Sequence, residues 1–155
     1  MESGQNEVSD DVAGRASITS RRIAAPRARV FRAFTDPARL ALWWGPRGFS
    51  NTFHEFDLRP GGYWRFIMHG PDGTDYPNES VFVEVTAPER VVLRHLNGHH
   101  FVLTICFTEC EGGTEVGWCQ AFDTPEHWRR IADFVAHANE ENLDRLAEVV
   151  AAMAD

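Results

Sequence analysis

The chain has 155 residues and a formal net charge of −8 at pH 7, with 23 acidic and 15 basic residues. This length fits one domain, and the acidic balance disfavours binding to nucleic acid or to an anionic membrane, because no stripe of basic side chains is present to neutralise phosphates. The 3 cysteines cannot all pair in disulfides. No signal peptide or long apolar run opens the chain, so we expect a reducing, cytoplasmic location.

The N-terminal residues 1–14 are polar and acidic, and they contain almost no large apolar side chain. Such a composition cannot repay the entropy cost of ordering, so it predicts a disordered tail. Residues 15–155 are expected to form a single domain. Within it, a weak alternation over residues 15–24 predicts a strand that ends at Ala25-Pro26.

Two short helices are predicted after this strand. Residues 26–34 begin with a proline and place apolar side chains on one helical face. Thr35-Asp36-Pro37 is a second helix start, because a capping side chain is followed by a proline. This second helix runs to Trp43-Trp44, and Gly45-Pro46 ends it.

Short segments rich in β-branched and aromatic residues come next, separated by turn signals, and this texture is typical of an antiparallel sheet. We expect six strands, over residues 52–58, 63–69, 80–86, 90–96, 101–108 and 115–122. The predicted joints between them are Gly61-Gly62, residues 70–78, Ala87-Pro88-Glu89, residues 97–100 and Gly112-Gly113.

The last hairpin allows a prediction of register. A two-residue turn at Gly112-Gly113 predicts an inner layer that faces the terminal helix, with two cysteines opposite each other on the outer face. The predicted inner pairs are Leu103 with Phe122, Ile105 with Gln120 and Phe107 with Trp118, and the outer pair is Cys106 with Cys119.

A second register follows if the turn at residues 87–89 places Val85 opposite Val91. Strand alternation then divides the side chains between the two faces. Val81, Val83, Val91, Leu93 and His95 are predicted to be inside, with Phe82, Glu84 and Arg94 outside. The two predicted faces agree only if an odd-length loop or a bulge lies between Leu96 and Val102.

The end of the chain has a strong helical signal. Thr124-Pro125-Glu126 is a helix start, and apolar residues from Phe134 to Met153 recur mostly three, four or seven positions apart. His137 and Asn139 interrupt this stripe, which predicts a short helix over residues 125–135 and a longer one to about residue 153. The fold class is therefore α+β, with a terminal helix on one face of a curved, seven-stranded antiparallel sheet, in the order β-α-α-β6-α.

Six motifs in this order resemble one known family. They are residues 22–34, Trp43-Trp44-Gly45-Pro46, residues 57–62, Gly70-Pro71-Asp72-Gly73, residues 84–90 and Leu143-Asp144-Arg145-Leu146. Over residues 15 to 153 the chain is similar to the homologues of the activator of the heat-shock-protein-90 ATPase, in the START-like or SRPBCC superfamily. Members often carry a Gly-Trp pair where this chain has Ala138-Asn139.

The resemblance implies a helix-grip fold, in which the sheet wraps the long C-terminal helix and leaves an apolar cavity. We therefore expect a domain that binds a small apolar or aromatic molecule, with His95 or Gln120 as the orienting polar group. The expected ligand-binding residues are Trp43, Trp44, Trp64, Phe66, Met68, Leu93, His95, Leu103, Ile105, Trp118, Gln120 and Phe134. The two tryptophans of the Trp43-Trp44 pair have an alternative role in packing the end of their helix.

Two other functions remain open at this stage. The family name suggests a protein-interaction module that regulates the ATPase of a chaperone, and the superfamily also contains enzymes of the polyketide-cyclase type. For the latter, His95 or Tyr76 in the cavity would carry the chemistry, although no Gly-x-Ser-x-Gly or Cys–His signature is present, so an enzyme is the less favoured hypothesis.

No metal or cofactor is expected. His95, His99 and His100 lie close in sequence but lack a recognised ligand spacing. Gly61-Gly62 is not followed by a helix start, so it does not predict a phosphate site. The exposed edge of the sheet is compatible with a monomer or a homodimer.

Overall fold

The computed structural model describes residues 14–153, so the predicted N-terminal tail lies, apart from Gly14, outside the described residues. The elements are β1 (Ala16–Ile23), α2 (Arg27–Thr35), α3 (Pro37–Trp43), β2 (Ser50–Phe56), β3 (Tyr63–His69), β4 (Asp75–Thr86), β5 (Arg90–His95), β6 (Phe101–Cys110), β7 (Gly113–Phe122) and α4 (Pro125–Ala152). The predicted order of elements is therefore confirmed. β4 begins five residues earlier than predicted, because the turn after β3 is shorter than the sequence indicated.

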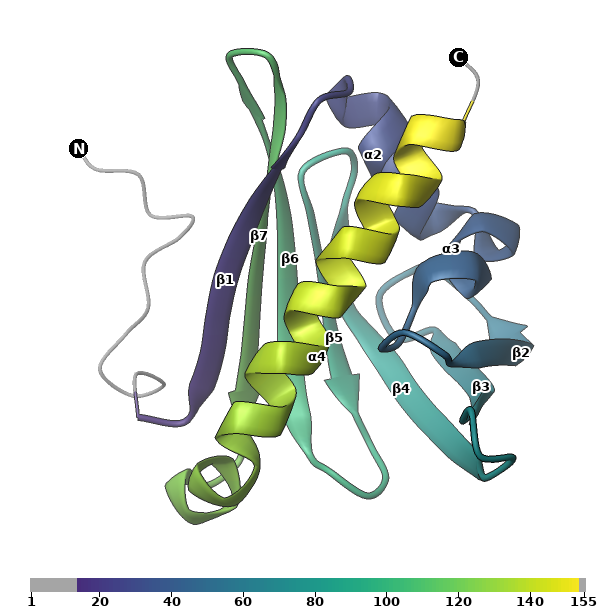
Figure 1. Ribbon diagram of the computed structural model, residues 1–155, viewed down its shortest axis with the longest axis vertical. Helices are drawn as coiled ribbons and strands as arrows, with labels where there is room; N and C mark the ends of the chain where they lie inside the picture. The colour runs from purple at the N-terminus through teal and green to yellow at the C-terminus, as the bar shows by residue number, and fades with distance from the viewer. Residues whose placement is uncertain (1–13, 154–155) are drawn as a thin grey trace.

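The strands form a seven-stranded antiparallel sheet in the order β1-β7-β6-β5-β4-β3-β2. The sheet curves around α4, which crosses its concave face, while α2 and α3 lie beside the C-terminal part of α4 (Figure 1). This is the helix-grip arrangement, and the predicted fold class is confirmed. No helix within residues 14–153 has the length and apolarity needed to span a bilayer.

The terminal helix α4 is continuous, so the predicted break at residues 136–139 is wrong. Its start is as expected, since the Thr124 side chain accepts a hydrogen bond from the backbone N–H of His127 at 3.2 Å. His137 lies on the exposed face, with its Nε2 3.2 Å from a carboxylate oxygen of Glu141. Asn139 is buried against the sheet. A polar residue on the buried face of a continuous helix therefore looks, in the sequence, like an interruption of the apolar stripe.

The hairpin of β6 and β7 has the predicted faces but not the predicted pairs. Cys110 pairs with Gly113, so residues 111–112 form the turn and every pair is shifted by two residues. A shift of two preserves strand alternation, so the same side chains still face α4. The observed pairs are Leu103 with Gln120, Ile105 with Trp118 and Phe107 with Val116, while Cys119 lies opposite Thr104 and Cys106 opposite Gly117.

The backbone of β1 explains why the turn precedes Gly113. A Cβ atom at Gly113 would lie 2.1 Å from the carbonyl oxygen of Ile23. Gly113 is therefore needed inside β7, where it lets β1 approach closely, and Gly112 takes the left-handed conformation of the turn with φ of 83°. The predicted pairing of Cys106 with Cys119 is wrong for this reason.

The second predicted register is correct at Val85, which pairs with Val91. A bulge in β4 makes the predicted faces wrong for the residues that precede Glu84. The register shifts between Phe82 and Glu84, so Phe82 is buried at 1% exposure and Val83 is 54% exposed. Three consecutive apolar residues at 81–83 conceal this change in the sequence. The predicted odd-length connection between β5 and β6 is confirmed, and it consists of residues 96–100.

The two halves of α4 meet different parts of the molecule. The C-terminal half contributes Leu143, Leu146 and Val150 to the main hydrophobic core, together with side chains of α2, α3 and the sheet. The N-terminal half, from Ile131 to Asn142, instead borders a pocket above the concave face. The core thus fixes the position of the helix, and the pocket lies at the other end.

Candidate ligand-binding pocket

A pocket of about 520 Å³ lies between the N-terminal half of α4 and the concave face of the sheet. α4 contributes Ile131, Phe134, Val135, Ala138, Asn139 and Asn142 to its lining, and the segment after α3 contributes Trp44, Gly45, Pro46 and Phe49. The strands supply most of the remaining wall. Such a volume, with a mainly apolar lining and a few polar groups, is typical of a small-molecule site.

Most of the predicted site residues line this pocket. They are Trp44, Trp64, Phe66, Met68, Leu93, His95, Leu103, Trp118, Gln120 and Phe134. Trp43 and Ile105 do not line it and are buried in the core. The indole N–H of Trp43 donates to the carbonyl oxygen of Ala33 at 2.9 Å. Trp43 thus packs the end of its helix, whereas Trp44 lines the pocket. Phe134 lies at the mouth, because 69% of it is exposed.

Three tryptophans from different elements form an aromatic wall. The ring centroid of Trp44 lies 4.9 Å from that of Trp64 and 5.7 Å from that of Trp118. Trp64 also stacks on Phe66 at 4.5 Å. The indole nitrogens of Trp64 and Trp118 are buried without a hydrogen-bond partner among the described residues. Their rings are packed among other aromatic rings, which favours planar apolar surfaces in this region.

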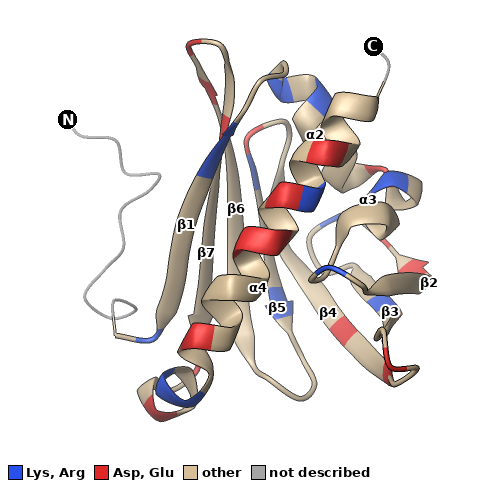
Figure 2. Cartoon of the chain, viewed as in Figure 1, with Lys and Arg blue, Asp and Glu red and all other residues tan. Residues whose placement is uncertain are grey.

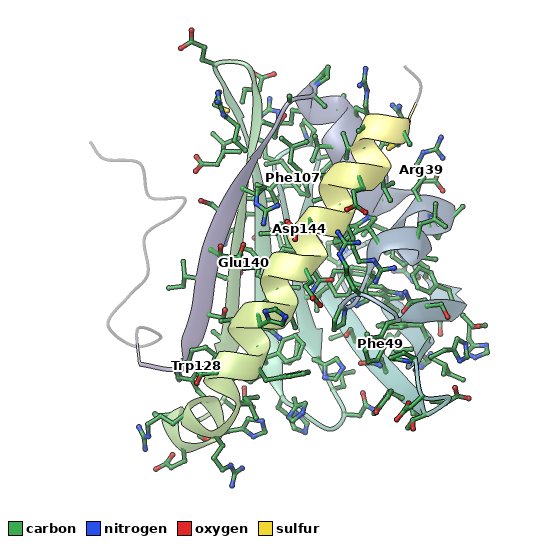
Figure 3. All side chains as sticks on the ribbon, viewed as in Figure 1. Arg39, Phe49, Phe107, Trp128, Glu140 and Asp144 are labelled. Carbon is green, nitrogen blue, oxygen red and sulfur yellow. The ribbon has the colours of Figure 1, made fainter. Side chains whose placement is uncertain are left out.

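Arg145 holds the segment that carries Trp44. Its guanidinium donates to the carbonyl oxygens of Gly45 at 2.7 Å and Pro46 at 2.8 Å. It also donates to the carbonyl oxygens of Leu42 at 2.9 Å and Phe49 at 3.1 Å. Five donors in a rigid fork make arginine suitable for such multiple contacts. Phe49, at the end of this segment, lies on the β2 and β3 side of α4 (Figure 3).

His95 is held by the protein on both sides of its ring. Nδ1 lies 2.6 Å from the carbonyl oxygen of His99, and Nε2 lies 2.7 Å from Oδ1 of Asn78. Burial lowers the pKa of His95, although the hydrogen bond to His99 opposes this effect. The lowered pKa favours the neutral ring, which carries one N–H and donates to one of these two oxygens, while the other nitrogen is covered by the second oxygen. The two predicted orienting groups are His95 and Gln120. Each ring nitrogen of His95 lies against an oxygen of the protein, which leaves Gln120 as the better placed group to contact a ligand.

A second histidine contact lies beside the pocket and involves its lining residue His99. Nδ1 of His99 lies 2.8 Å from Nε2 of His127, which connects the loop between β5 and β6 to the first turns of α4. Burial, followed by the nearby charge of His127, lowers the pKa of His99. A hydrogen bond between two ring nitrogens needs one of them to donate and the other to accept, so the two rings must hold complementary tautomers.

A chain of amides crosses from the segment after α3 to β7. The backbone N–H of Gly45 donates to Oδ1 of Asn142 at 2.7 Å, and Nδ2 of Asn142 donates to Oδ1 of Asn139 at 3.4 Å. Nδ2 of Asn139 then donates to Oε1 of Gln120 at 2.9 Å. We call these three side chains, Asn142, Asn139 and Gln120, the amide relay.

The asparagines of the relay are the main residues that sequence reasoning missed. Asn139 and Asn142 are three positions apart on one helical face, and both are buried. The signal was therefore present as polar residues at helical spacing within an apolar stripe. In the sequence this signal resembles a helix break, because the partners Gly45 and Gln120 lie far from the helix along the chain.

No Asp, Glu, Lys or Arg lines the pocket within residues 14–153. The charges of α4 lie away from it, where Arg21 of β1 contacts Glu140 at 3.0 Å and Asp144 at 2.7 Å (Figures 2 and 3). Burying an unpaired charge is very costly. The pocket is thus suited to a neutral occupant.

Comparison with known proteins gives a family match over residues 24–151, to the model described as "Activator of Hsp90 ATPase homolog 1-like protein". Among solved structures, a protein of Nitrosomonas europaea is 25% identical with a TM-score of 0.82, and the match covers 90% of this chain and 96% of that chain. A protein of Rhodobacter sphaeroides is 26% identical with a TM-score of 0.82, covering 92% and 95%.

An AHSA1-like protein of Aeromonas hydrophila is 23% identical with a TM-score of 0.70, and the match covers 88% of this chain and 92% of that chain. This last similarity concerns the fold. A comparison with curated proteins gives no significant match.

Proposed function

The chain belongs to the family of activator of Hsp90 ATPase homolog 1-like proteins, and from this premise we propose that it binds a small apolar or aromatic molecule between the sheet and α4. The observation that carries the proposal is the uncharged, largely aromatic pocket of about 520 Å³. Pockets of roughly 300–1,000 Å³ with apolar walls and a few polar groups are typical of small-molecule sites. Residues 15–155 would act as a single ligand-binding domain in the cytoplasm.

The aromatic wall supplies most of the binding energy in this proposal. Trp44, Trp64 and Trp118 offer large flat surfaces, and burial of an apolar ligand against them releases ordered water. Phe134 is well placed to cover a bound molecule, because it lies exposed at the mouth while its neighbour Val135 is buried. The geometry of the segment carrying Trp44 is set by Arg145, so the wall is present before a ligand arrives.

The two alternatives have less support. Chaperone regulation rests on the family description, and a polyketide-cyclase-like reaction would need a free acid or base in the pocket. Both nitrogens of His95 face carbonyl oxygens of the protein. Tyr76 is 45% exposed and lines the mouth. A binding function without chemistry therefore fits the arrangement best.

The proposal is tested by filling the pocket from the helix. Ala138 lines the pocket, whereas Ala136, two positions earlier on α4, is exposed. We expect Ala138→Trp to weaken binding of the neutral dye Nile red by at least about tenfold, since an added indole occupies the space that a ligand needs. The matched control Ala136→Trp should bind the dye as the wild type does.

Fluorescence titration measures both affinities, and native mass spectrometry of the freshly purified protein shows whether a small molecule is retained. Equal dye affinities for Ala138→Trp and the wild type would contradict the proposal. A stable complex with a chaperone, together with no dye binding by the wild type, would favour the interaction module instead.

A further inference from the structure

The amide relay has a defined direction, and this direction fixes what it presents to the pocket. A backbone N–H can only donate, so Oδ1 of Asn142 must be the atom that faces Gly45. Each amide then donates to the next one, and the relay ends on Oε1 of Gln120. The orientation of these amides therefore follows from the network, without the usual ambiguity between O and N.

The end of the relay leaves one donor group without a partner. Nε2 of Gln120 carries two N–H groups, and neither donates to any described residue of the protein, while Gln120 lines the pocket. The protein alone leaves this half-buried amide in reach of solvent, but a ligand that fills the pocket would cover it, and a covered donor needs an acceptor because leaving it unpaired is costly. A ligand oxygen at this position would complete the relay.

Ser80 gives an independent indication that the occupant is partly polar. It lines the pocket on β4, it is only 2% exposed, and its hydroxyl has no hydrogen-bond partner among the described residues. A hydroxyl can donate or accept, so it adds hydrogen-bonding capacity without charge. Gln120 on β7 and Ser80 on β4 thus add to the uncharged polar groups of the wall, which also include the unpartnered indole N–H groups of Trp64 and Trp118.

An anionic ligand would find no compensating charge here. The guanidinium of Arg145 is directed to four carbonyl oxygens, and that of Arg21 is paired with Glu140 and Asp144. His95 has a pKa lowered by burial and is neutral. Transfer of a carboxylate from water into this pocket would therefore lose more hydration energy than the amide donors return.

We infer that the pocket selects uncharged aromatic molecules bearing a carbonyl-type oxygen, which accepts a hydrogen bond from the side-chain amide of Gln120, and that it discriminates against aromatic carboxylates. This inference rests on the proposed binding function and specifies its ligand class. The aromatic wall recognises the ring system, and the relay recognises the oxygen.

Three probes that share one ring system test it. They are 2-acetonaphthone, with a neutral carbonyl, 2-ethylnaphthalene, with no acceptor, and 2-naphthoate, with a charged carboxylate. Their affinities are measured by displacement of Nile red at pH 7.5. The ketone should bind about three- to tenfold more tightly than the hydrocarbon, as one net hydrogen bond predicts, and the carboxylate should bind most weakly.

Gln120→Leu removes the amide donor and keeps an apolar side chain of similar size. In this variant the ketone should lose its advantage over the hydrocarbon, while the hydrocarbon keeps its wild-type affinity within about threefold. If Gln120→Leu does not fold, the side-chain amide signals of Gln120 in the NMR spectrum of the wild type serve instead. They should lie further downfield with the ketone than with the hydrocarbon.

Two results would overturn the inference. The first is binding of 2-naphthoate as tight as that of the ketone, and the second is a ketone advantage that persists in Gln120→Leu or coincides with unchanged amide signals. Either result leaves the binding function intact, because all three probes still displace the dye. Failure of all three probes, together with unchanged dye binding by Ala138→Trp, would instead contradict the proposed function itself.

Discussion

Two buried hydroxyls on the strands differ in whether the protein gives them a partner. Thr114 is fully buried, and its Oγ1 donates to the carbonyl oxygen of Ala25 at 2.8 Å. Ser80 is nearly as buried but has no partner among the described residues. The first hydroxyl contributes to stability, whereas the second is available to an occupant of the pocket.

Substitution of these two residues should therefore have different effects. We expect Thr114→Val to lower the free energy of unfolding by about 1–2 kcal/mol, because the carbonyl of Ala25 loses its donor. Ser80→Ala should leave it within about 0.5 kcal/mol of the wild type. Urea denaturation measures both. A loss for Ser80→Ala as large as that for Thr114→Val would mean that the Ser80 hydroxyl is satisfied inside the protein.

At the scale of elements, α4 is connected to the segment after α3 mainly by polar contacts. Asn142 accepts from the backbone of Gly45, and Arg145 donates to four carbonyl oxygens of residues 42–49. Gly45 allows this close packing, since its φ is 99° and a Cβ there would lie 2.7 Å from Cε of Met68. In the Leu143-Asp144-Arg145-Leu146 motif, the two leucines thus pack in the core. Asp144 contacts Arg21 of β1, and Arg145 contacts the segment after α3.

Loss of the Arg145 contacts should affect both stability and binding. We expect Arg145→Ala to lower the free energy of unfolding by about 2–4 kcal/mol, because several partly buried carbonyl oxygens lose a charged donor. The affinity for Nile red should fall as well, since the segment carrying Trp44 is no longer held. Arg129, exposed near the start of α4, provides the control Arg129→Ala, for which we expect a change within about 0.5 kcal/mol.

Chemical denaturation and dye titration of the two variants check this prediction. Wild-type stability in Arg145→Ala would show that the segment is held by its apolar side chains alone. If stability falls but the affinity for the dye stays at the wild-type value, the arginine contacts are not needed to hold Trp44 in position.

At the scale of the whole molecule, folding is linked to pH through two histidines beside the pocket. Burial is the main cause that lowers the pKa of His95 and His99 in the folded protein below their ordinary value of 6.5. As the pH falls through this value, the unfolded chain takes up protons before the folded protein does. The stability that the neutral rings contribute is therefore present above pH 6.5 and is lost progressively below it.

We expect the free energy of unfolding to fall between about pH 7.5 and pH 5.5, a window that lies above the ordinary range of carboxylates. Urea denaturation at several pH values measures this slope. His99→Asn should make it shallower, because the asparagine side chain does not titrate in this range. Stability that rises as the pH falls would contradict the assignment of neutral buried rings.

The sequence alone determined the order of elements and the fold class, and it placed most of its candidate site residues on strand and helix faces that line the pocket. This succeeded because strand alternation and helical periodicity are local patterns that follow directly from backbone geometry. The inner faces of β6 and β7 are an example, since a register error of two residues left Leu103, Ile105 and Trp118 on the correct face.

Other features were decided only by the tertiary structure. Gly113 lies within β7 because β1 passes close to it, and Phe82 turns inward because a bulge absorbs Val83. Asn139 continues α4 because Gln120, far away in the sequence, accepts its hydrogen bond. In each case the deciding contact joins residues on different elements, and local sequence patterns carry no record of such partners.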